Sequence, residues 1–364
     1  MSLFDHLKAQ GVAYPCILLV LSLLMVNIAL WVITVLVLKE FPAVVSTVAL
    51  AYTLGLRHAV DADHICAIDN VTRRLIQLDQ KPITVGFYFS LGHSTVVFAA
   101  TVAVMAAVNS IETELESFQE IGSIIGTSVS VSFLLLIAGI NGFALYGTYG
   151  ALERLANSGE YEEIDMNEYL ENAGCLGKCL KPLFSAVNAP WKMYPLGLLF
   201  GLGFDTSIEV TFLAISATQT APLYSLILLP LMFAAGMCII DTLDGILMLG
   251  AYGFASVNPI KKLLYNMFVT LFSVLFAMMI AFVQLFSLIG SQMEDRTPFW
   301  AFFVSAGEHL ETIGYIVIAT FMFSWFVAYV VYKRQGFKEL ADDFDKRTAI
   351  MDGSACDETT VANL

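Results

Sequence analysis

The stretch CILLVLSLLMVNIALWVITVLVL, residues 16–38, contains no charged residue and is long enough to cross a bilayer as a helix. No small-residue cleavage site follows it, so we interpret it as an anchor and not as a signal peptide. Seven further apolar stretches of similar length follow, which is typical of transmembrane helices. The sequence therefore predicts an all-α membrane protein, a polytopic bundle of eight transmembrane helices at residues 16–38, 43–69, 83–108, 121–148, 193–216, 224–252, 263–290 and 301–332.

The composition excludes several classes of protein. Of the 364 residues, 58% are hydrophobic and only 14% are charged, whereas a soluble domain carries about 25% charged residues. The formal net charge of −14 argues against nucleic acid as a partner. The six cysteines are scattered, so they indicate neither a disulfide framework nor a zinc site. The chain has no phosphate-binding GxxxxGK[ST] motif and no HExxH protease motif, and its five histidines are too few for a membrane oxygenase.

The basic residues predict the orientation in the membrane. With both termini cytoplasmic, the inner loops and ends hold fifteen of the 18 Lys and Arg residues, and the outer loops hold Lys39 and Arg296. Arg57 is the only basic residue inside a predicted span. We expect a multi-pass membrane protein with one transmembrane domain over 1–335, a cytoplasmic loop at about 149–192 and a polar cytoplasmic tail over 336–364. The predicted outer loops carry Glu40, Glu112, Glu114, Glu116, Glu120, Glu294 and Asp295, which either attract cations or belong to ordinary solvated loops.

The second span carries an unusual number of ionisable residues, in the run GLRHAVDADHICAIDN at residues 55–70. Charged groups are costly inside a bilayer and usually functional there. On a continuous helix His58, Asp61 and His64 step by three and share one side. Asp63 then points away and either orients a ligand or pairs with Arg57. Two imidazoles and a carboxylate on one face favour a first-row divalent metal over Mg²⁺ or Ca²⁺, although helix–helix hydrogen bonding is the alternative.

Other spans carry isolated polar residues of the same types. His93 is the ionisable residue of the third span, Asp205 and Glu209 lie four apart in the fifth, and Asp241 and Asp244 lie three apart in the sixth. We expect His58, His93, Asp205 and Asp241 at similar depth, close to the midplane where secondary transporters bind their substrates. Interhelical hydrogen bonding remains the alternative for each. Gly-Leu precedes the acidic residues of the second and fifth spans, at 55–56 and 201–202, which makes an inverted repeat one interpretation.

Four motifs on separate spans, RHAVDADHI (57–65), LGHSTVV (91–97), LGFDTSIE (202–209) and GMCIIDTLDG (236–245), resemble the signatures of the nickel/cobalt transporter (NiCoT) family. The H-x4-D-H pattern of the first motif is the most specific. Ser207-Ile208 departs from the Ala-Thr that is usual in the family. The resemblance implies a secondary permease for uptake of Ni²⁺ or Co²⁺ across the plasma (inner) membrane, with no ATPase subunit. It gives importance to His58, Asp61, Asp63, His64, His93, Asp205, Glu209, Asp241 and Asp244.

The expected partners are therefore the Ni²⁺ or Co²⁺ ion as substrate and the lipid bilayer, without a resident cofactor and without enzymatic activity. The nearest alternative is efflux of these ions or transport of another divalent metal. A metal-dependent membrane enzyme would need an open coordination position, a base and room for an organic substrate. A metal-sensing receptor would need an output surface, for which the small polar loops leave little room.

Overall fold

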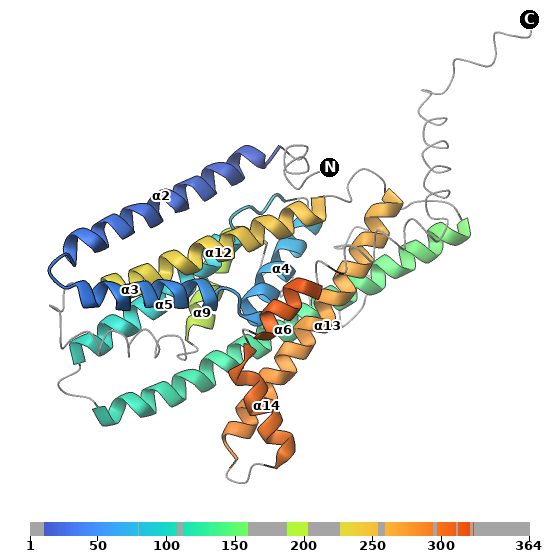
Figure 1. The fold of residues 1–364 in the computed structure, drawn as a ribbon. Helices are drawn as coiled ribbons and strands as arrows, with labels where there is room; N and C mark the ends of the chain where they lie inside the picture. Colours follow the sequence, from blue (N-terminus) through green and yellow to red (C-terminus); the bar gives the residue numbers. More distant parts are fainter. Residues whose placement is uncertain are drawn as a thin grey trace, which may run out of the picture.

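The computed structural model describes residues 11–78, 80–107, 112–158, 188–202, 226–253, 259–293, 297–310, 312–320 and 323. Within these ranges the regular structure is entirely helical (Figure 1). Proline opens several of the helices, where its missing N–H costs no hydrogen bond. The elements are α2 (Ala13–Val37), α3 (Pro42–His58), α4 (Ala62–Gln77), α5 (Val85–Ala107), α6 (Glu112–Ser158), the 3-10 helix η1 (Pro190–Lys192), α9 (Met193–Gly201), α12 (Leu228–Gly253), α13 (Pro259–Ser291) and α14 (Pro298–Glu308).

The described helices confirm a multispan membrane protein but not the full predicted count. Five are long and apolar enough to cross a membrane, and the bent pair α3–α4 makes a sixth. Most of the predicted fifth span lies outside the described residues. The predicted eighth span begins as α14, which ends at Glu308. Helices α6 and α13 are longer than predicted, so the acidic residues from Glu112 onwards and the start of the expected 149–192 loop are helical.

The prediction of one continuous helix over 43–69 is wrong. Helix α3 ends at His58, α4 begins at Ala62, and the two axes differ by 51°. The break needs neither glycine nor proline, because Asp61 takes the extended conformation of a helix N-cap (φ −59°, ψ 141°). His58, Asp61 and His64 therefore do not share one helical face. They lie instead around a bend between two helices.

Helix α12 is the centre of the described bundle. It packs against α2, α3, α4 and α5, while α5 packs on α9 and α6 packs along α13 (Figure 1). Helix α4 is enclosed by these neighbours, and every side chain from His64 to Leu75 is buried. The enclosed set includes Arg73 and Arg74, each 3% exposed. These two arginines, predicted in an inner loop or at the inner end of a span, are thus part of a buried helix.

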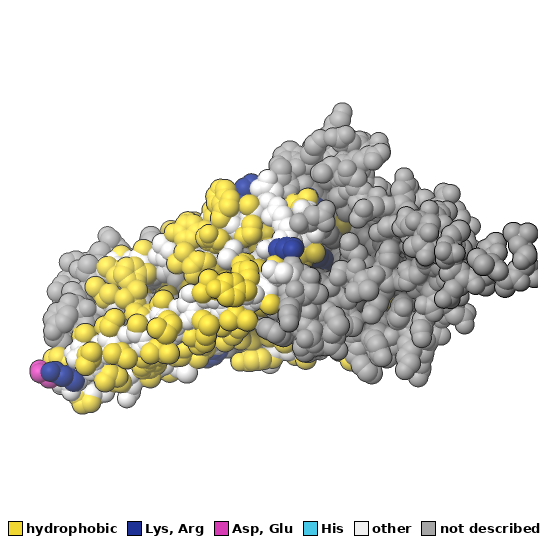
Figure 2. Space-filling view, turned by 90° about the horizontal axis from the view of Figure 1, so that it is seen from above, with side chains coloured by type: hydrophobic (Ala, Val, Ile, Leu, Met, Phe, Trp, Pro, Cys, Tyr) yellow, Lys and Arg dark blue, Asp and Glu magenta, His cyan; other side chains and the backbone are white. Residues whose placement is uncertain are grey.

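Helix α2 lies at the edge of the bundle and presents apolar side chains outwards. Its buried face is narrow, comprising Ala13, Cys16, Leu23, Asn27 and Thr34. Helix α2 packs on α12, where Asn27 donates to the carbonyl of Ala235 at 3.4 Å. Residues such as Leu21, Met25 and Leu36 are more than half exposed. Seen from above, the described surface is almost continuously hydrophobic (Figure 2). A surface of this kind is stable in contact with lipid acyl chains.

Candidate metal site

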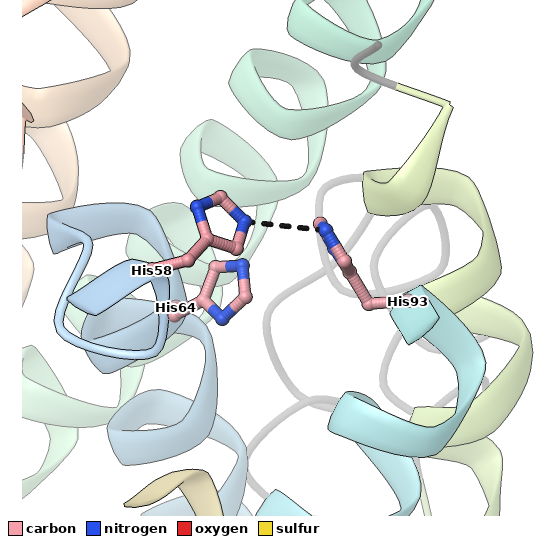
Figure 3. A group of neighbouring side chains, drawn as sticks. All are labelled: His58, His64 and His93. Atoms are coloured by element: carbon pink, nitrogen blue, oxygen red, sulfur yellow. Dashed lines mark hydrogen bonds between the residues drawn. The ribbon is translucent and has the colours of Figure 1, made fainter. Parts of the chain in front are cut away.

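Three imidazoles meet at the bend between α3 and α4. His58 ends α3, His64 lies in the first turn of α4, and His93 comes from α5 (Figure 3). One ring nitrogen from each lies within 4.8 Å of the others, and the three ring centroids are 4.7–4.9 Å apart. The Nε2 atoms of His58 and His93 are 3.2 Å apart. Two nitrogen ligands of one first-row metal ion, each at about 2.1 Å, are separated by roughly 3.0–3.4 Å, so this pair has the spacing of two metal ligands.

Asp61 orients His58. Its Oδ2 lies 3.0 Å from Nδ1 of His58 across the helix break, and as the N-cap residue it makes no side-chain bond to α4. A carboxylate that accepts the hydrogen bond from Nδ1–H leaves the Nε2 lone pair free to bind a metal. Such a carboxylate is the usual outer partner of a metal-binding histidine. This carboxylate–imidazole pair therefore lies at the bend, between the last residue of α3 and the N-cap of α4.

His64 and Asp241 are the most deeply buried members of the group, 1% and 0% exposed. The Nδ1 of His64 lies 3.5 Å from an Asp241 oxygen, too far for a good hydrogen bond. Within the described residues, neither ring nitrogen of His64 and neither carboxylate oxygen of Asp241 makes a hydrogen bond of normal geometry. Buried polar atoms without partners are costly. A divalent cation would satisfy both groups at once.

Close backbone contacts hold these helices together around the site. A Cβ added at Gly86 on α5 would overlap the carbonyl of Asp241 on α12, and one added at Gly201 on α9 would meet the backbone of His93. Phe89 packs against His64 at a centroid distance of 4.8 Å, and Phe233 packs against His58 at 5.9 Å. The aromatic rings make the surroundings apolar, which strengthens electrostatic attraction to a cation.

The remaining predicted residues divide into three groups. Asp63 is held by hydrogen bonds to the His64 backbone and to Gln284, and does not join the imidazole cluster directly. Asp244 lies one turn beyond Asp241 on α12, with one buried oxygen that lacks a hydrogen-bond partner in the described part of the chain. Asp205 and Glu209 lie outside the described residues. The structure thus brings His58, Asp61, His64, His93 and Asp241 together.

Gln284 is the polar residue that the sequence analysis missed. It lies in the span predicted at 263–290, is 5% exposed and donates from Nε2 to Asp63 at 3.2 Å. The available signal was an amide in an otherwise apolar span. An uncharged amide stands out less from the sequence than an ionisable side chain does.

The fold and the site define a class: a polytopic helical membrane protein with a buried imidazole–carboxylate group suited to a divalent first-row metal. The profile of one family, described as high-affinity nickel-transport protein, matches residues 44–331. The chain belongs to that family. No solved structure matches it significantly.

Characterised relatives cover most of the chain. A high-affinity nickel transport protein of Cupriavidus necator is 42% identical over 320 residues, which is 87% of this chain and 91% of the relative. The nickel transporter NicT of Mycobacterium tuberculosis is 43% identical over 289 residues, 78% of this chain and 77% of its own. The cobalt transport protein NhlF of Rhodococcus rhodochrous is 36% identical over 285 residues, 76% and 79% of the two chains.

Proposed function

We propose that this protein is a secondary permease that takes up Ni²⁺, Co²⁺ or both across the plasma membrane. The observation that carries the proposal is the meeting of His58, His64 and His93 inside the helical bundle. Imidazole and carboxylate ligands suit nickel and cobalt, whereas Cu(I) prefers sulfur ligands. The relatives named as nickel and cobalt transporters support the same substrates.

The proposed binding and transfer path combines ligands from four spans. The ion loses water as it meets the imidazoles of the α3–α4 bend and of α5. Carboxylates of the fifth and sixth spans complete the coordination or take the ion onward. The residues assigned to this path are His58, Asp61, Asp63, His64, His93, Asp205, Glu209, Asp241 and Asp244.

The membrane potential can supply the energy. Moving one charge across 100 mV is worth about 2.3 kcal/mol, so a divalent ion gains roughly 4.6 kcal/mol. Since 1.4 kcal/mol corresponds to a factor of ten, this supports an inward gradient of about 10³. Uptake of a trace metal needs no larger concentration gradient. The proposed transport therefore requires neither ATP nor an ATPase subunit.

We also propose the predicted topology in full: eight spans, both termini cytoplasmic, a transmembrane domain over 1–335 with its cytoplasmic loop at about 149–192, and a polar tail over 336–364. The mean hydropathy of +0.75 supports a domain that lies mostly within the bilayer. The excess of basic residues on the inner side supports the orientation. Within this topology, helices α3 and α9 belong to spans that run in opposite directions.

Two helix crossings support an inverted repeat. A Cβ added at Gly55 on α3 would overlap the carbonyl of Phe233 on α12, and one added at Gly197 on α9 would overlap the carbonyl of Phe89 on α5. Each glycine lies three residues after a tyrosine, in YTLGL (52–56) and YPLGL (194–198). In this repeat the Gly-Leu pair at 55–56 therefore corresponds to the pair at 197–198, and not to the pair at 201–202 that the sequence analysis compared with it.

The partner helices repeat the same arrangement. On α12, Gly236 follows Phe233 by three residues and meets the carbonyl of Tyr52; on α5, Gly92 follows Phe89 by three and meets the carbonyl of Tyr194. The α3–α12 and α5–α9 crossings are therefore the same contact made twice. In this pairing α3 corresponds to α9, and α12 corresponds to α5.

Uptake of radioactive nickel tests the function. Cells without a nickel transporter of their own would express the wild type, His58→Ala, His64→Ala, or His309→Ala as a matched control. His309 is exposed at the C-cap of α14 and is not one of the three clustered imidazoles. We expect uptake by the wild type and the control, with unlabelled cobalt as an effective competitor. Absence of wild-type uptake, or loss of preloaded metal from the expressing cells, would contradict the proposal.

A further inference from the structure

A chain of hydrogen bonds reaches the metal site from the opposite side of the bundle. Ser130 on α6 donates to Oε1 of Gln284 on α13 at 2.9 Å, and Gln284 donates to Oδ2 of Asp63 at 3.2 Å. The other Asp63 oxygen accepts from the backbone N–H of His64 at 2.9 Å. Because Ser130 occupies the amide oxygen, the NH₂ of Gln284 must face Asp63. The chain ends on the backbone of a proposed metal ligand.

The same pair of helices holds α4 at a second place. Ser273 on α13 donates to Oδ1 of Asn70 at 2.9 Å and also to the carboxylate of Asp69. Asn141 on α6 donates to the same Asn70 oxygen. Residues 63–64 and 69–70 lie near the start and the middle of α4. A serine and an amide from the α6–α13 contact therefore fix this helix at two points.

These two serine–amide pairs are related by the internal repeat. The segment TSVSVSFLLLIAGIN (127–141) of α6 matches TLFSVLFAMMIAFVQ (270–284) of α13, with Asn141 aligned to Gln284. Each aligned pair is separated by 143 residues, and the identical pairs are Thr127/Thr270, Ser130/Ser273, Val131/Val274, Phe133/Phe276, Ile137/Ile280 and Ala138/Ala281. In this alignment Ser130 corresponds to Ser273, and Gln284 corresponds to Asn141. The pair Ser130–Gln284 contacts Asp63 at the metal site, whereas Ser273 and Asn141 contact Asn70 away from it.

We propose that Ser130 and Gln284 are positioning residues of the metal site, which orient Asp63 and thereby align the first turn of α4 and His64. This inference rests on the proposed function. The side chains of Ser130 and Gln284 are 4% and 5% exposed, so water cannot take over their hydrogen bonds. Loss of either removes the restraint on Asp63 and leaves its carboxylate partly desolvated.

The effect should appear in metal affinity and coordination. Outer partners of metal ligands change affinity by about 10–100-fold when they are removed. We expect Gln284→Leu to raise the nickel concentration for half-maximal uptake at least about tenfold, with a smaller change in maximal rate per molecule. Ser130→Ala should act in the same direction more weakly, and Ser130→Thr, which keeps the hydroxyl, should restore most of the affinity.

The experiment compares these variants with Ser132→Ala. Ser132 lies two residues along α6, is exposed and donates to the Ser128 carbonyl of its own helix. Uptake kinetics in cells would be combined with membrane abundance and with the visible absorption spectrum of Co²⁺ bound to the purified full-length protein. The spectrum reports coordination geometry, which a purely structural role would not change. We expect altered spectra for Gln284→Leu and Ser130→Ala, and a wild-type spectrum for Ser132→Ala.

The outcomes separate this inference from the function itself. Wild-type half-saturation and a wild-type spectrum in Ser130→Ala and Gln284→Leu would overturn the positioning role while leaving transport intact. If Gln284→Leu fails to accumulate in the membrane, the result for Ser130→Ala decides. Failure of the wild type to bind or take up either metal would instead contradict the proposed function.

Discussion

Helix α4 carries two buried polar clusters that differ in how their atoms are paired. The first cluster lies at the N-terminus of α4 and joins His64 to Asp241 of α12. Among the described residues, the ring nitrogens of His64 and the carboxylate oxygens of Asp241 make no hydrogen bond of normal geometry. Further along, Asp69 accepts from Arg73 at 2.6 Å and from Ser273. In the second cluster the Asp69 carboxylate is paired by side chains of the protein itself. In the first, the Asp241 carboxylate lacks such a hydrogen bond from the described residues and is suited to a cation, and we expect this difference between the two carboxylates to separate a binding site from a structural network.

The largest expected effect comes from removing an imidazole of the first cluster. His58→Ala and His64→Ala should each abolish uptake at trace nickel, because each removes a ligand that no neighbour can replace. Abundance in the membrane should stay close to that of wild type. Uptake assays paired with immunoblots of the membrane fraction check both statements. Normal uptake by either variant would remove the histidine cluster from the transport path.

Neutralising the carboxylates should have the next largest effect. Asp241→Asn keeps the size and hydrogen-bonding capacity of the side chain but removes its charge. If Asp241 faces the ion, uptake should fall more than about tenfold while the protein still folds. The same change at Asp205 tests the fifth span. Full uptake by both asparagine variants would restrict the site to the α3–α4 bend and α5.

Acid should weaken the first cluster selectively. Neutral imidazole binds metal, and an unperturbed histidine has a pKa of about 6.5. Protons compete with the metal for the imidazole nitrogens, so nickel affinity should drop at least about tenfold between pH 7 and pH 5. Equilibrium binding to the purified protein measures this. A constant affinity over that range would indicate binding by carboxylates alone.

The smallest effect is expected in the second cluster. Ser273→Ala removes two hydrogen bonds that Asp69 and Asn70 accept, which should cost about 1–2 kcal/mol of stability. The half-saturation concentration for nickel should stay near the wild-type value. Ser291→Ala is the matched control, since Ser291 is an exposed serine on the same helix. Thermal unfolding in detergent compares the two, and a strong loss of nickel affinity in Ser273→Ala would erase the distinction between the clusters.

The sequence was most informative about ionisable side chains, because these are rare inside apolar spans. Histidines inside apolar spans stand out, so His58, His64 and His93 could be singled out without a structure. The bend at residues 59–61 could not, because Ala-Val-Asp contains no helix breaker and only the tertiary fold selects the N-cap conformation of Asp61. The burial of Arg73 and Arg74 could not be predicted for a related reason: basic residues at the end of an apolar run usually mark an exposed cytoplasmic end. Here the enclosing helices bury them.

The enclosure of α4 also bears on how the protein is made. A helix that carries Asp63, Asp69, Arg73 and Arg74 gains little from entering lipid by itself, since each charge at the centre of a span costs about 2.5–3.5 kcal/mol. Its covering helices α6, α12 and α13 are all synthesised after it. We therefore expect α3 to insert early through its own apolarity, and α4 to settle only when α12 and α13 have left the ribosome. Biogenesis would then end with the step that assembles the metal site.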